Sequence, residues 1–435
     1  MHTRQDTGER SEEAFTDINI AAFDIVHISM ENWEGVWRRN QPVAREFARR
    51  GASQGRRVLY VGLSLDVSHA LRKRDWRTLV QALRPSRLTT VPDAENIFLM
   101  NPVKWLPNTL NLGRAFNQWW EWRQIREACR LLEIERPLLW MNPHYALHLV
   151  GGLNERLTVY DIGDDWTIPD QKEWLRQLTL AQDKALCRIS DVVIVVSEHL
   201  QELKRPLAHR LHHIPNGVYA ERYSAVYRHT LPTHPLTEDW EHPVLGYTGT
   251  LHTGRIDVDL IVQLARHLDR GTIALIGPNH LDEVAMAKLQ AEPKIRLIDA
   301  VPFAAMPRLM SAFDVCIVPH VVSAFTESLS PLKLYECLAS GLPTIATPIS
   351  GFRDFPDLFY LASDSDAFMR AVTLALQEDE NLPMRRQKAA RQHSWDTRMD
   401  AIEAALSSAL IEKEQERAGM QFPKVPSSIL KKTEW

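Results

Sequence analysis

The feature that most constrains the fold is a regular alternation of short apolar segments with amphipathic helical stretches along almost the whole chain. Such alternation is typical of βαβ units, which build parallel sheets. Because the apolar segments are near-continuous runs of Val, Ile and Leu, we expect helices on both faces of each sheet. The predicted strands are residues 23–29, 56–62, 137–141, 157–161, 191–197, 243–249, 272–278, 294–299, 314–320 and 342–348, together with a short strand in LHHIPNGV (211–218) that runs into a turn.

The chain of 435 residues is longer than one hydrophobic core usually supports, so two domains are expected. The apolar periodicity lapses at residues 219–242, which are rich in proline and histidine and are predicted to be a linker. We therefore predict an α/β protein with two doubly wound, Rossmann-like domains facing a cleft, residues 1–218 and 243–395. Residues 396–435 are expected to begin as a charged helix that either packs back on the first domain or stays mobile.

Composition excludes several classes of protein. The formal net charge of -4 excludes a generally basic protein that binds nucleic acid. Cys129, Cys187, Cys316 and Cys337 form no C-x-x-C pair, which argues against a zinc site and a disulfide framework. The first residues hold no apolar segment of a signal peptide, and no run approaches the length of a membrane span, so a cytoplasmic location is predicted.

The segment 326–351 carries the strongest functional signal. Ser330 and Pro331 are typical of an N-cap followed by the first residue of a helix. Lys333 then stands in the first turn, where the helix terminus is already positive, so an anion bound there would explain its presence. Glu336 lies on the same helix face and can accept hydrogen bonds from a ribose. The alternative is a surface helix with an exposed Lys–Glu pair.

Three motifs, in this order, resemble those of GT-B glycosyltransferases, especially bacterial members close to glycosyltransferase family 4. The segment DVVIVVSEHLQELKR with HHIPNGV resembles the end of the family's acceptor domain, and LGYTGTLHTGRIDVDLI resembles the opening of its donor domain. SPLKLYECLASGLPTIAT resembles the donor-binding helix with its (N/S)PLK-x-(Y/F)E motif. The resemblance covers residues 23 to about 396 and implies a nucleotide-sugar donor in the second domain and an acceptor in the first.

The resemblance also implies roles for single residues. Glu336 matches the second Glu of the family's E-x7-E motif, which contacts the donor's ribose. Ser328 stands where many members have the first Glu, and Glu327 is one place off, so either is expected to take over the contact with the sugar. Arg255 matches a diphosphate-binding position, and Lys333 supplies a second charge. The predicted donor site comprises Gly249, Arg255, Gly277, Ser328, Ser330, Leu332, Lys333 and Glu336.

No metal or other cofactor is expected for this donor site. No D-x-D motif stands at a predicted strand end as a pair of metal ligands. Two positive side chains facing a diphosphate can replace the charge of a metal ion. The nucleotide sugar is thus predicted to be a co-substrate that binds without metal.

Three carboxylates, Asp161, Asp164 and Asp165, follow the predicted strand 157–161. Their repulsion either raises one pKa for proton transfer, or the group binds acceptor hydroxyls. Asp161 is the first choice for a general base in an inverting enzyme, with Asp164 and Glu327 as further catalytic candidates. In a retaining enzyme the carboxylates would position the acceptor. The predicted acceptor site comprises Glu31, Trp33, Arg38 and Asp165.

Residues 71–136 combine positive charge with aromatic side chains. They hold 12 Lys/Arg against 7 Asp/Glu, and five Trp at 76, 105, 119, 120 and 122. This combination suits an anionic membrane surface and predicts peripheral contact with the inner face of a membrane. The alternative is that the Trp side chains pack in the core and the Arg side chains cover helices.

The leading hypothesis is a hexosyltransferase-type enzyme. It would move a sugar from a nucleotide diphosphate donor, with UDP as the first choice, to a glycan or lipid-linked acceptor in cell-surface polysaccharide or glycoconjugate biosynthesis. A nucleotide-sugar 2-epimerase, which shares the architecture, is the second hypothesis. A non-catalytic nucleotide-sugar-binding protein is the third, suggested by the missing first Glu.

Overall fold

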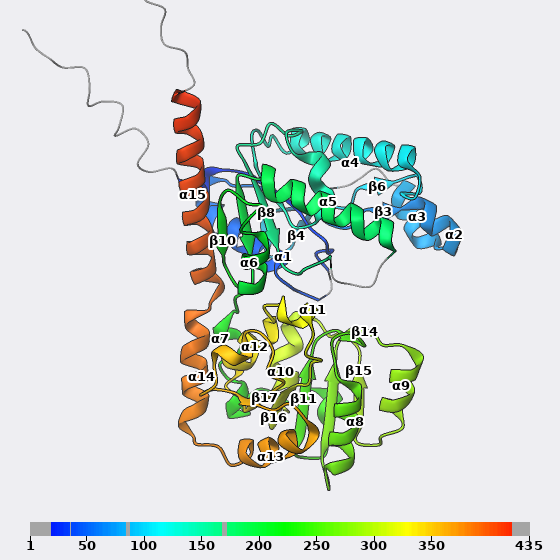
Figure 1. Cartoon of the computed structure of the whole chain (residues 1–435), viewed down its shortest axis with the longest axis vertical. Helices are drawn as coiled ribbons and strands as arrows, with labels where there is room; N and C mark the ends of the chain where they lie inside the picture. The colour runs from blue at the N-terminus through cyan, green and yellow to red at the C-terminus, as the bar shows by residue number, and fades with distance from the viewer. Residues whose placement is uncertain (1–18, 35, 84–87, 168–171, 420–435) are drawn as a thin grey trace, which may run out of the picture.

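The computed structural model describes residues 19–34, 36–83, 88–167 and 172–419. Two α/β domains lie one above the other, and a helical segment near the C-terminus runs along one side of both (Figure 1). The prediction of an α/β protein with two sheets that are parallel throughout most of their width is confirmed.

The N-terminal domain is built around an eight-stranded sheet. Every neighbouring pair of strands is parallel except β4 with β5. In sheet order the strands are β10 (Leu211–His213), β9 (Val192–Val195), β8 (Leu157–Ile162), β7 (Leu138–Met141), β1 (Ile25–Ile28), β2 (Val58–Val61), β5 (Ala94–Met100) and β4 (Thr89–Val91).

Helices cover both faces of this sheet. Side chains alternate along each strand, so that Ile25 packs on one side and Val26 on the other. One face packs against α1 (Asn40–Gly51). The opposite face packs against α4 (Asn111–Leu131), α5 (Glu173–Ile189) and α6 (Glu198–Lys204). The buried strands thus have apolar neighbours on both sides, as their composition predicts.

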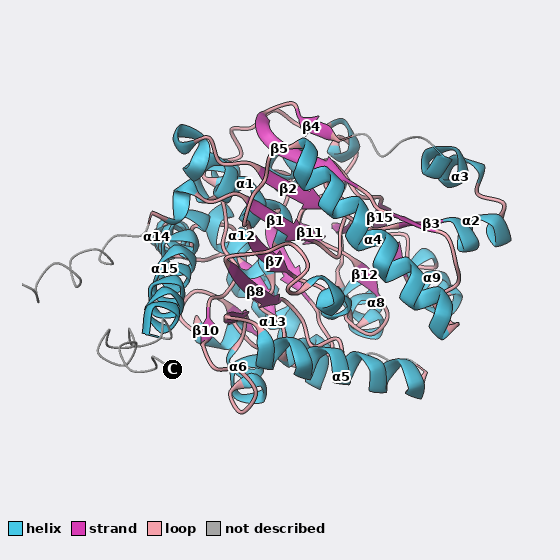
Figure 2. Ribbon diagram, turned by 90° about the horizontal axis from the view of Figure 1, so that it is seen from above, coloured by secondary structure: helices cyan, strands magenta, loops and turns pink. Residues whose placement is uncertain are grey.

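A small layer stands at the edge of the N-terminal domain. It consists of α2 (Val67–Lys73), α3 (Trp76–Leu83) and a two-stranded sheet of β3 (Leu65–Asp66) with β6 (Val103–Lys104). Its own small core contains Val67, Leu79 and Val103. In both Figure 1 and Figure 2 this layer lies on the opposite side of the domain from α15 (Trp395–Gly419).

The C-terminal domain repeats the architecture with six parallel strands. In sheet order these are β15 (Ile295–Ile298), β13 (Thr272–Ile276), β11 (Val244–Thr248), β16 (Val315–Val318), β17 (Thr344–Ala346) and β18 (Tyr360–Leu361). One face packs against α8 (Val258–His267), α9 (Glu283–Gln290) and α13 (Ser365–Ala375). The other packs against α10 (Met306–Met310), α12 (Leu332–Ser340) and α14 (Asn381–Gln392).

Shorter elements complete the second domain and the connection to it. The two-residue strands β12 (Leu251–His252) and β14 (Asn279–His280) pair in parallel beyond the main sheet. The short helix α11 (Ala324–Glu327) precedes α12. Helix α7 (Ala220–Tyr223) lies in the predicted linker 219–242, which begins six residues after the end of β10 and ends two residues before the start of β11.

The last helix returns to the first domain. Trp395, Met399, Ile402 and Leu406 of α15 belong to the same buried cluster as the inner residues of β1, β2, β7 and β8. At the edge of this cluster, Arg50 of α1 donates hydrogen bonds to Asp400 (2.7 Å) and Glu403 (3.0 Å) of α15. Residues 396–419 therefore follow the first of the two alternatives and pack back on the N-terminal domain. Residues 420–435 lie outside the described residues. The helix begins at Trp395, one residue before the predicted boundary at 396.

Candidate active site

A pocket of about 660 Å³ lies between the domains, at the carboxyl ends of both parallel sheets. The loops after β1 and β8 line it from the N-terminal domain, and the loops after β11, β13 and β16 and the start of α12 from the C-terminal domain. Crevices of this kind are where open α/β sheets bind ligands. The predicted residues that line it are Glu31, Arg38, Asp164, Gly249, Arg255, Gly277, Ser330, Leu332, Lys333 and Glu336.

Helix α12 points its N-terminus into this pocket. It starts at Leu332, with Pro331 at the N-cap and no side-chain cap. The predicted Ser330 cap is wrong, because that hydroxyl accepts a hydrogen bond from the backbone N–H of Asn216 instead (3.3 Å). Within the described residues, the backbone N–H groups of Leu332 and Lys333 have no hydrogen-bond partner. Such an open terminus has partial positive charge and can bind an anion.

The side chain of Lys333 lies beside the turn after β11. Its Nζ is 5.0 Å from the centre of the Tyr247 ring, and a Cβ atom at Gly249 would lie 2.1 Å from that nitrogen. Lys333 forms no ion pair with any carboxylate of the described residues. Burial, reinforced by the charge of Arg255, lowers the pKa of Lys333 to about 8. An anion in the pocket would stabilise the protonated form.

Arg255 adds a second positive charge to the same wall. Its Nε is buried and has no hydrogen-bond partner among the described residues. Its guanidinium lies 5.6 Å from the centre of the Phe325 ring. Two partly buried cations close together without a counter-ion cost free energy, so Arg255 and Lys333 together indicate that the pocket takes an anionic ligand.

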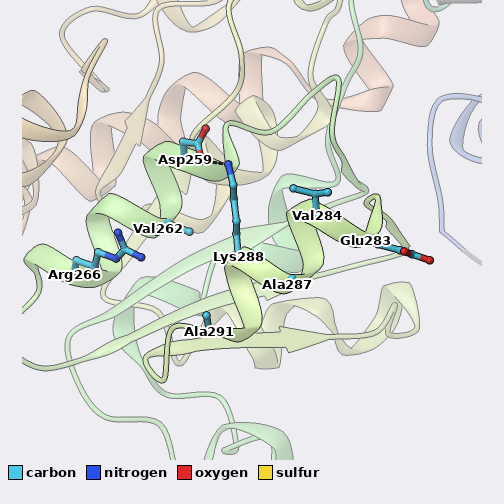
Figure 3. A pocket seen from close by; sticks show the side chains of 8 residues that line it. All are labelled: Asp259, Val262, Arg266, Glu283, Val284, Ala287, Lys288 and Ala291. Atoms are coloured by element: carbon cyan, nitrogen blue, oxygen red, sulfur yellow. Dashed lines mark hydrogen bonds and ion pairs between the residues drawn. The ribbon is translucent and has the colours of Figure 1, made fainter.

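A second hollow gives a useful contrast. It measures about 610 Å³ and lies between α8 and α9, away from the interdomain pocket (Figure 3). Its Lys288 is ion-paired with Asp259 (2.6 Å), and its Arg266 with Glu292 (2.6 Å). Because each of these cations already has a carboxylate partner, this hollow lacks the unneutralised charge of the interdomain pocket.

Glu336 lies one turn after Lys333 on the wall of the pocket. Its Oε1 accepts a hydrogen bond from the hydroxyl of Tyr223 (3.1 Å). Burial raises the pKa of Glu336, and the charge of Lys333 opposes that rise. Within the described residues Oε2 accepts no hydrogen bond, so it is free to accept one from a ligand hydroxyl. Sequence reasoning did not identify Tyr223, which lies in the predicted linker.

Two glycines bring the loops after β11 and β13 together. Gly249 and Gly277 have φ values of 139° and 147°, which favour glycine. A Cβ atom at Gly277 would lie 2.2 Å from the carbonyl oxygen of Gly249. Backbone atoms therefore form this part of the wall, and a ligand can approach them closely.

His320 is a pocket residue that sequence reasoning missed. Its Nε2 is 3.1 Å from the hydroxyl of Tyr247, while its Nδ1 is buried without a partner among the described residues. Burial, reinforced by the charges of Lys333 and Arg255, holds the pKa of His320 well below its usual value, so the ring is neutral. The available signal was its position at the end of the predicted strand 314–320.

Two predicted site residues do not line the pocket: Ser328 of the predicted donor site, and Glu327, a catalytic candidate. Ser328 is fully buried, and its hydroxyl donates to the carbonyl of Phe325 (2.7 Å). The carboxylate of Glu327 is paired with the guanidinium of Arg353 (2.5 Å). The expectation that either residue replaces the missing first Glu is therefore wrong for this conformation, because both side chains are engaged away from the pocket.

Asp161, the first choice for a general base, is also wrongly assigned. It is fully buried, and its two carboxylate oxygens accept hydrogen bonds from Nε of Arg39 at 2.9 and 2.8 Å. Arg39 lines the pocket and also donates to Asn216 Oδ1 (3.2 Å). Asp161 thus holds Arg39 in place and has no access to an acceptor. Only the neighbouring Arg38 had been singled out from the sequence.

The other two acidic residues after β8 differ from each other. Asp165 is buried and accepts hydrogen bonds from the backbone N–H (3.0 Å) and hydroxyl (2.6 Å) of Thr167, so it caps a turn and does not line the pocket. Asp164 does line it. Burial raises the pKa of Asp164 to about 6, with the charge of Arg255 opposing the rise. Of the three carboxylates, Asp164 alone can act on a ligand there.

The loop after β1 reaches across the pocket. Arg38 is ion-paired with Glu31 (2.9 Å) and donates to Thr250 Oγ1 of the other domain (3.4 Å). Trp37 stacks on Phe303, also of the other domain, with ring centres 5.1 Å apart. Trp33, a predicted acceptor residue, instead packs behind the loop, where its ring contacts the rings of Trp37 and Tyr60.

Among the described residues, no group of three or more His, Cys, Asp or Glu side chains is placed to hold a metal ion. Donor binding without a metal nevertheless stays a prediction.

Comparison with known proteins relates the C-terminal domain to a family of glycosyl transferases. Residues 242–378 match the family model described as "Glycosyl transferases group 1". A protein of Bacillus subtilis (strain 168), TuaH, whose name describes it as a glycosyltransferase of teichuronic acid biosynthesis, is 25% identical over 255 residues. That match covers 55% of this chain and 64% of the length of the relative.

Solved structures share the two-domain fold. Sucrose-phosphate synthase from Thermosynechococcus elongatus has a TM-score of 0.60 at 16% identity, covering 91% of this chain and 100% of the other. Anabaena HepE, solved in complex with UDP-glucose, has a TM-score of 0.60 at 16% identity, covering 89% and 100%. Trehalose 6-phosphate synthase from Burkholderia multivorans has a TM-score of 0.61 at 12% identity, covering 89% and 98%. At these identities the likeness establishes the fold.

Proposed function

We propose, on the premise that residues 242–378 are a group 1 glycosyltransferase domain in a GT-B fold, that the chain transfers a sugar from a nucleoside diphosphate donor to an acceptor. The donor occupies the C-terminal side of the interdomain pocket, and the acceptor reaches it from the N-terminal side. UDP is the proposed carrier, because HepE, which shares the fold, was solved with UDP and with UDP-glucose.

One observation carries this proposal. Lys333 and Arg255 lie on one pocket wall without carboxylate partners among the described residues, beside the open N-terminus of α12. A diphosphate supplies the two or more negative charges that this wall lacks. Glu336, one turn further along α12, lies where the ribose of such a ligand would follow the phosphates.

The chemistry follows from this charge arrangement. As the bond between the sugar and the diphosphate breaks, negative charge grows on the leaving phosphate. Lys333, Arg255 and the amides of α12 stabilise that charge because they are already oriented towards it. Asp164 faces them across the pocket and is the proposed group for orienting the acceptor hydroxyl or taking its proton.

The acceptor is proposed to be a glycan or a lipid-linked sugar. The support is the name of TuaH, which refers to biosynthesis of a cell-surface polymer. The loop after β1, with Arg38 and Glu31 exposed to the pocket, is the part of the chain that would contact this acceptor. A place at the cytoplasmic face of a membrane is part of the same proposal.

Thermal stabilisation by nucleotides tests donor binding. UDP and UDP-sugars, compared with GDP and ADP, are expected to raise the melting temperature of the wild-type protein. Lys333→Ala and Glu336→Ala should lose most of that rise. Lys288→Ala, which removes a lysine from the hollow between α8 and α9, is the matched control and should respond as the wild type does. Stabilisation that is equal in all four proteins would contradict the proposed site.

A product assay then separates transfer from the two other hypotheses. With a radiolabelled UDP-sugar and a lipid extract as acceptor source, transfer predicts label in an extended acceptor. An epimerase would release an epimer without any acceptor, and a binding protein would leave the donor intact.

A further inference from the structure

Large apolar side chains are unevenly distributed over the protein surface. Residues 63–119 expose Leu63, Leu71, Trp76, Val80, Leu83, Leu106, Leu110, Leu112, Phe116 and Trp119. Residues 244–392, a segment more than twice as long, expose only Val284, Val322, Leu361, Leu374, Leu376 and Met384 among those described. The exposed apolar surface is therefore concentrated in the edge layer of the N-terminal domain and the adjoining start of α4.

Helix α3 presents one row of these side chains. Trp76, Val80 and Leu83 follow the spacing i, i+4, i+7, and their exposed fractions are 70%, 51% and 74%. Leu79 and Ala82, on the other face, are buried in the small core of the edge layer. A short helix that already packs one face thus leaves a second apolar face uncovered.

The start of α4 repeats this arrangement. Leu112, Phe116 and Trp119 again follow i, i+4, i+7, with exposed fractions of 87%, 39% and 49%. The ring centres of Phe116 and Trp119 lie 5.9 Å apart, and the ring of Trp120 stacks on Phe116 at 6.4 Å. The docking face, as we call it, consists of α2, α3 and residues 106–119, which lie on the side of the domain opposite α15 (Figure 2).

Positive charge lies beside the row on α3. Arg72, Lys73, Arg74 and Arg77 are exposed on α2 and α3 and in the turn between them. Within the described residues, no carboxylate forms an ion pair with any of the four. Asp75 is the exposed acidic residue of the same stretch. The face is therefore apolar and basic at once.

We infer that the docking face binds the surface of a bilayer that contains anionic lipid. Trp side chains favour the interface between head groups and acyl chains, and unpaired Lys and Arg side chains are attracted to anionic head groups. A second copy of this chain fits less well, because a twofold contact over this face would bring the two basic clusters together. Contact is with the membrane surface, since no helix of the described residues is long and apolar enough to cross it.

Vesicle flotation without any sugar substrate tests this inference, so its outcome is independent of the proposed transfer. The full chain is expected to float with vesicles of phosphatidylcholine and phosphatidylglycerol and to stay behind with phosphatidylcholine alone. The double variant Trp76→Ser/Leu83→Ser should bind at least about tenfold more weakly. The triple variant Arg72→Gln/Arg74→Gln/Arg77→Gln should bind the anionic vesicles on the order of a hundredfold more weakly. Its remaining binding should depend less on salt concentration.

Matched controls keep the result decisive. Leu374→Ser/Leu376→Ser removes two exposed apolar side chains from the C-terminal domain, 59% and 46% exposed, and this variant should float as the wild type does. All variants should keep the wild-type melting temperature. If the wild type floats with neither vesicle, or if the docking-face variants float as well as the control, the inference is overturned. A dimer in size-exclusion chromatography that the same variants dissociate, without any flotation, would instead assign the face to a second copy.

Discussion

The ammonium of Lys333 lies 5.0 Å from the centre of the Tyr247 ring, and the hydroxyl of that tyrosine is 3.1 Å from Nε2 of His320. The ring thus supports the lysine through a cation–π contact, while the histidine fixes the ring. His320 is neutral and adds no charge. The positive potential where the diphosphate is proposed to bind therefore comes from Lys333 and Arg255.

Substitution of Tyr247 separates these two contacts. Tyr247→Leu removes the ring and is expected to weaken UDP binding by about 0.5–2 kcal/mol, the range of a cation–π contact. Tyr247→Phe keeps the ring and should retain most of the affinity. Isothermal titration calorimetry with UDP measures both. Equal losses in the two variants would mean that the hydroxyl, and not the ring, supports Lys333.

The lowered pKa of Lys333 predicts a pH dependence of donor binding. Since the pKa is about 8 in the empty site, the lysine loses its proton as the pH rises through that value, and its attraction for a diphosphate goes with it. UDP affinity should fall by up to about tenfold per pH unit above 8, until the pKa of the complex is reached. Lys333→Arg keeps its charge and should show a flat profile from pH 7 to 9.5. A flat profile in the wild type would contradict this role.

The raised pKa of Asp164 predicts how the transfer rate changes at acidic pH. Burial raises its pKa to about 6, so the carboxylate is present above that pH and is lost below it. The transfer rate should therefore decline as the pH falls below about 6. In Asp164→Asn the rate should be lower at every pH, and this decline should be absent. If the variant keeps both the rate and the decline, another group accounts for the titration.

Asp161 is expected to support stability rather than catalysis. Asp161→Asn leaves the buried guanidinium of Arg39 without its counter-charge, which typically costs about 3–5 kcal/mol. Urea unfolding followed by circular dichroism should show this loss, whereas Asp164→Asn should unfold close to the wild type. A variant at 161 that folds normally and loses only transfer activity would restore the original assignment as general base.

Local patterns were sufficient to predict most of the fold. Each predicted strand overlaps a strand of the structure, because each is a run rich in apolar β-branched or aliphatic residues bounded by turns. β5 was missed since the polar side chains of Glu95 and Asn96 follow Ala94 at its start and shorten the apolar run. β4, an antiparallel edge strand of three residues, was too short to give a periodic signal.

Site residues could be predicted where their functional role shows in the local sequence pattern. A lysine in the first turn of a helix opposes the helix dipole, so Lys333 could be identified from the sequence, and with it Glu336. Asp161 was misassigned because its partner, Arg39, is 122 residues away and its burial depends on packing. His320 lines the pocket, and Tyr223 donates a hydrogen bond to Glu336, through contacts between elements distant in sequence, which no local pattern encodes.

The return of α15 to the first domain has a consequence for synthesis of the protein. The core around β1 and β7 lacks Trp395, Met399, Ile402 and Leu406 until the final helix has emerged from the ribosome. The C-terminal domain, whose six-stranded sheet and covering helices precede α15 in the chain, is fully translated before that moment. The domain that is translated first is therefore the one that finishes folding last, and its unfinished apolar face is exposed throughout most of translation.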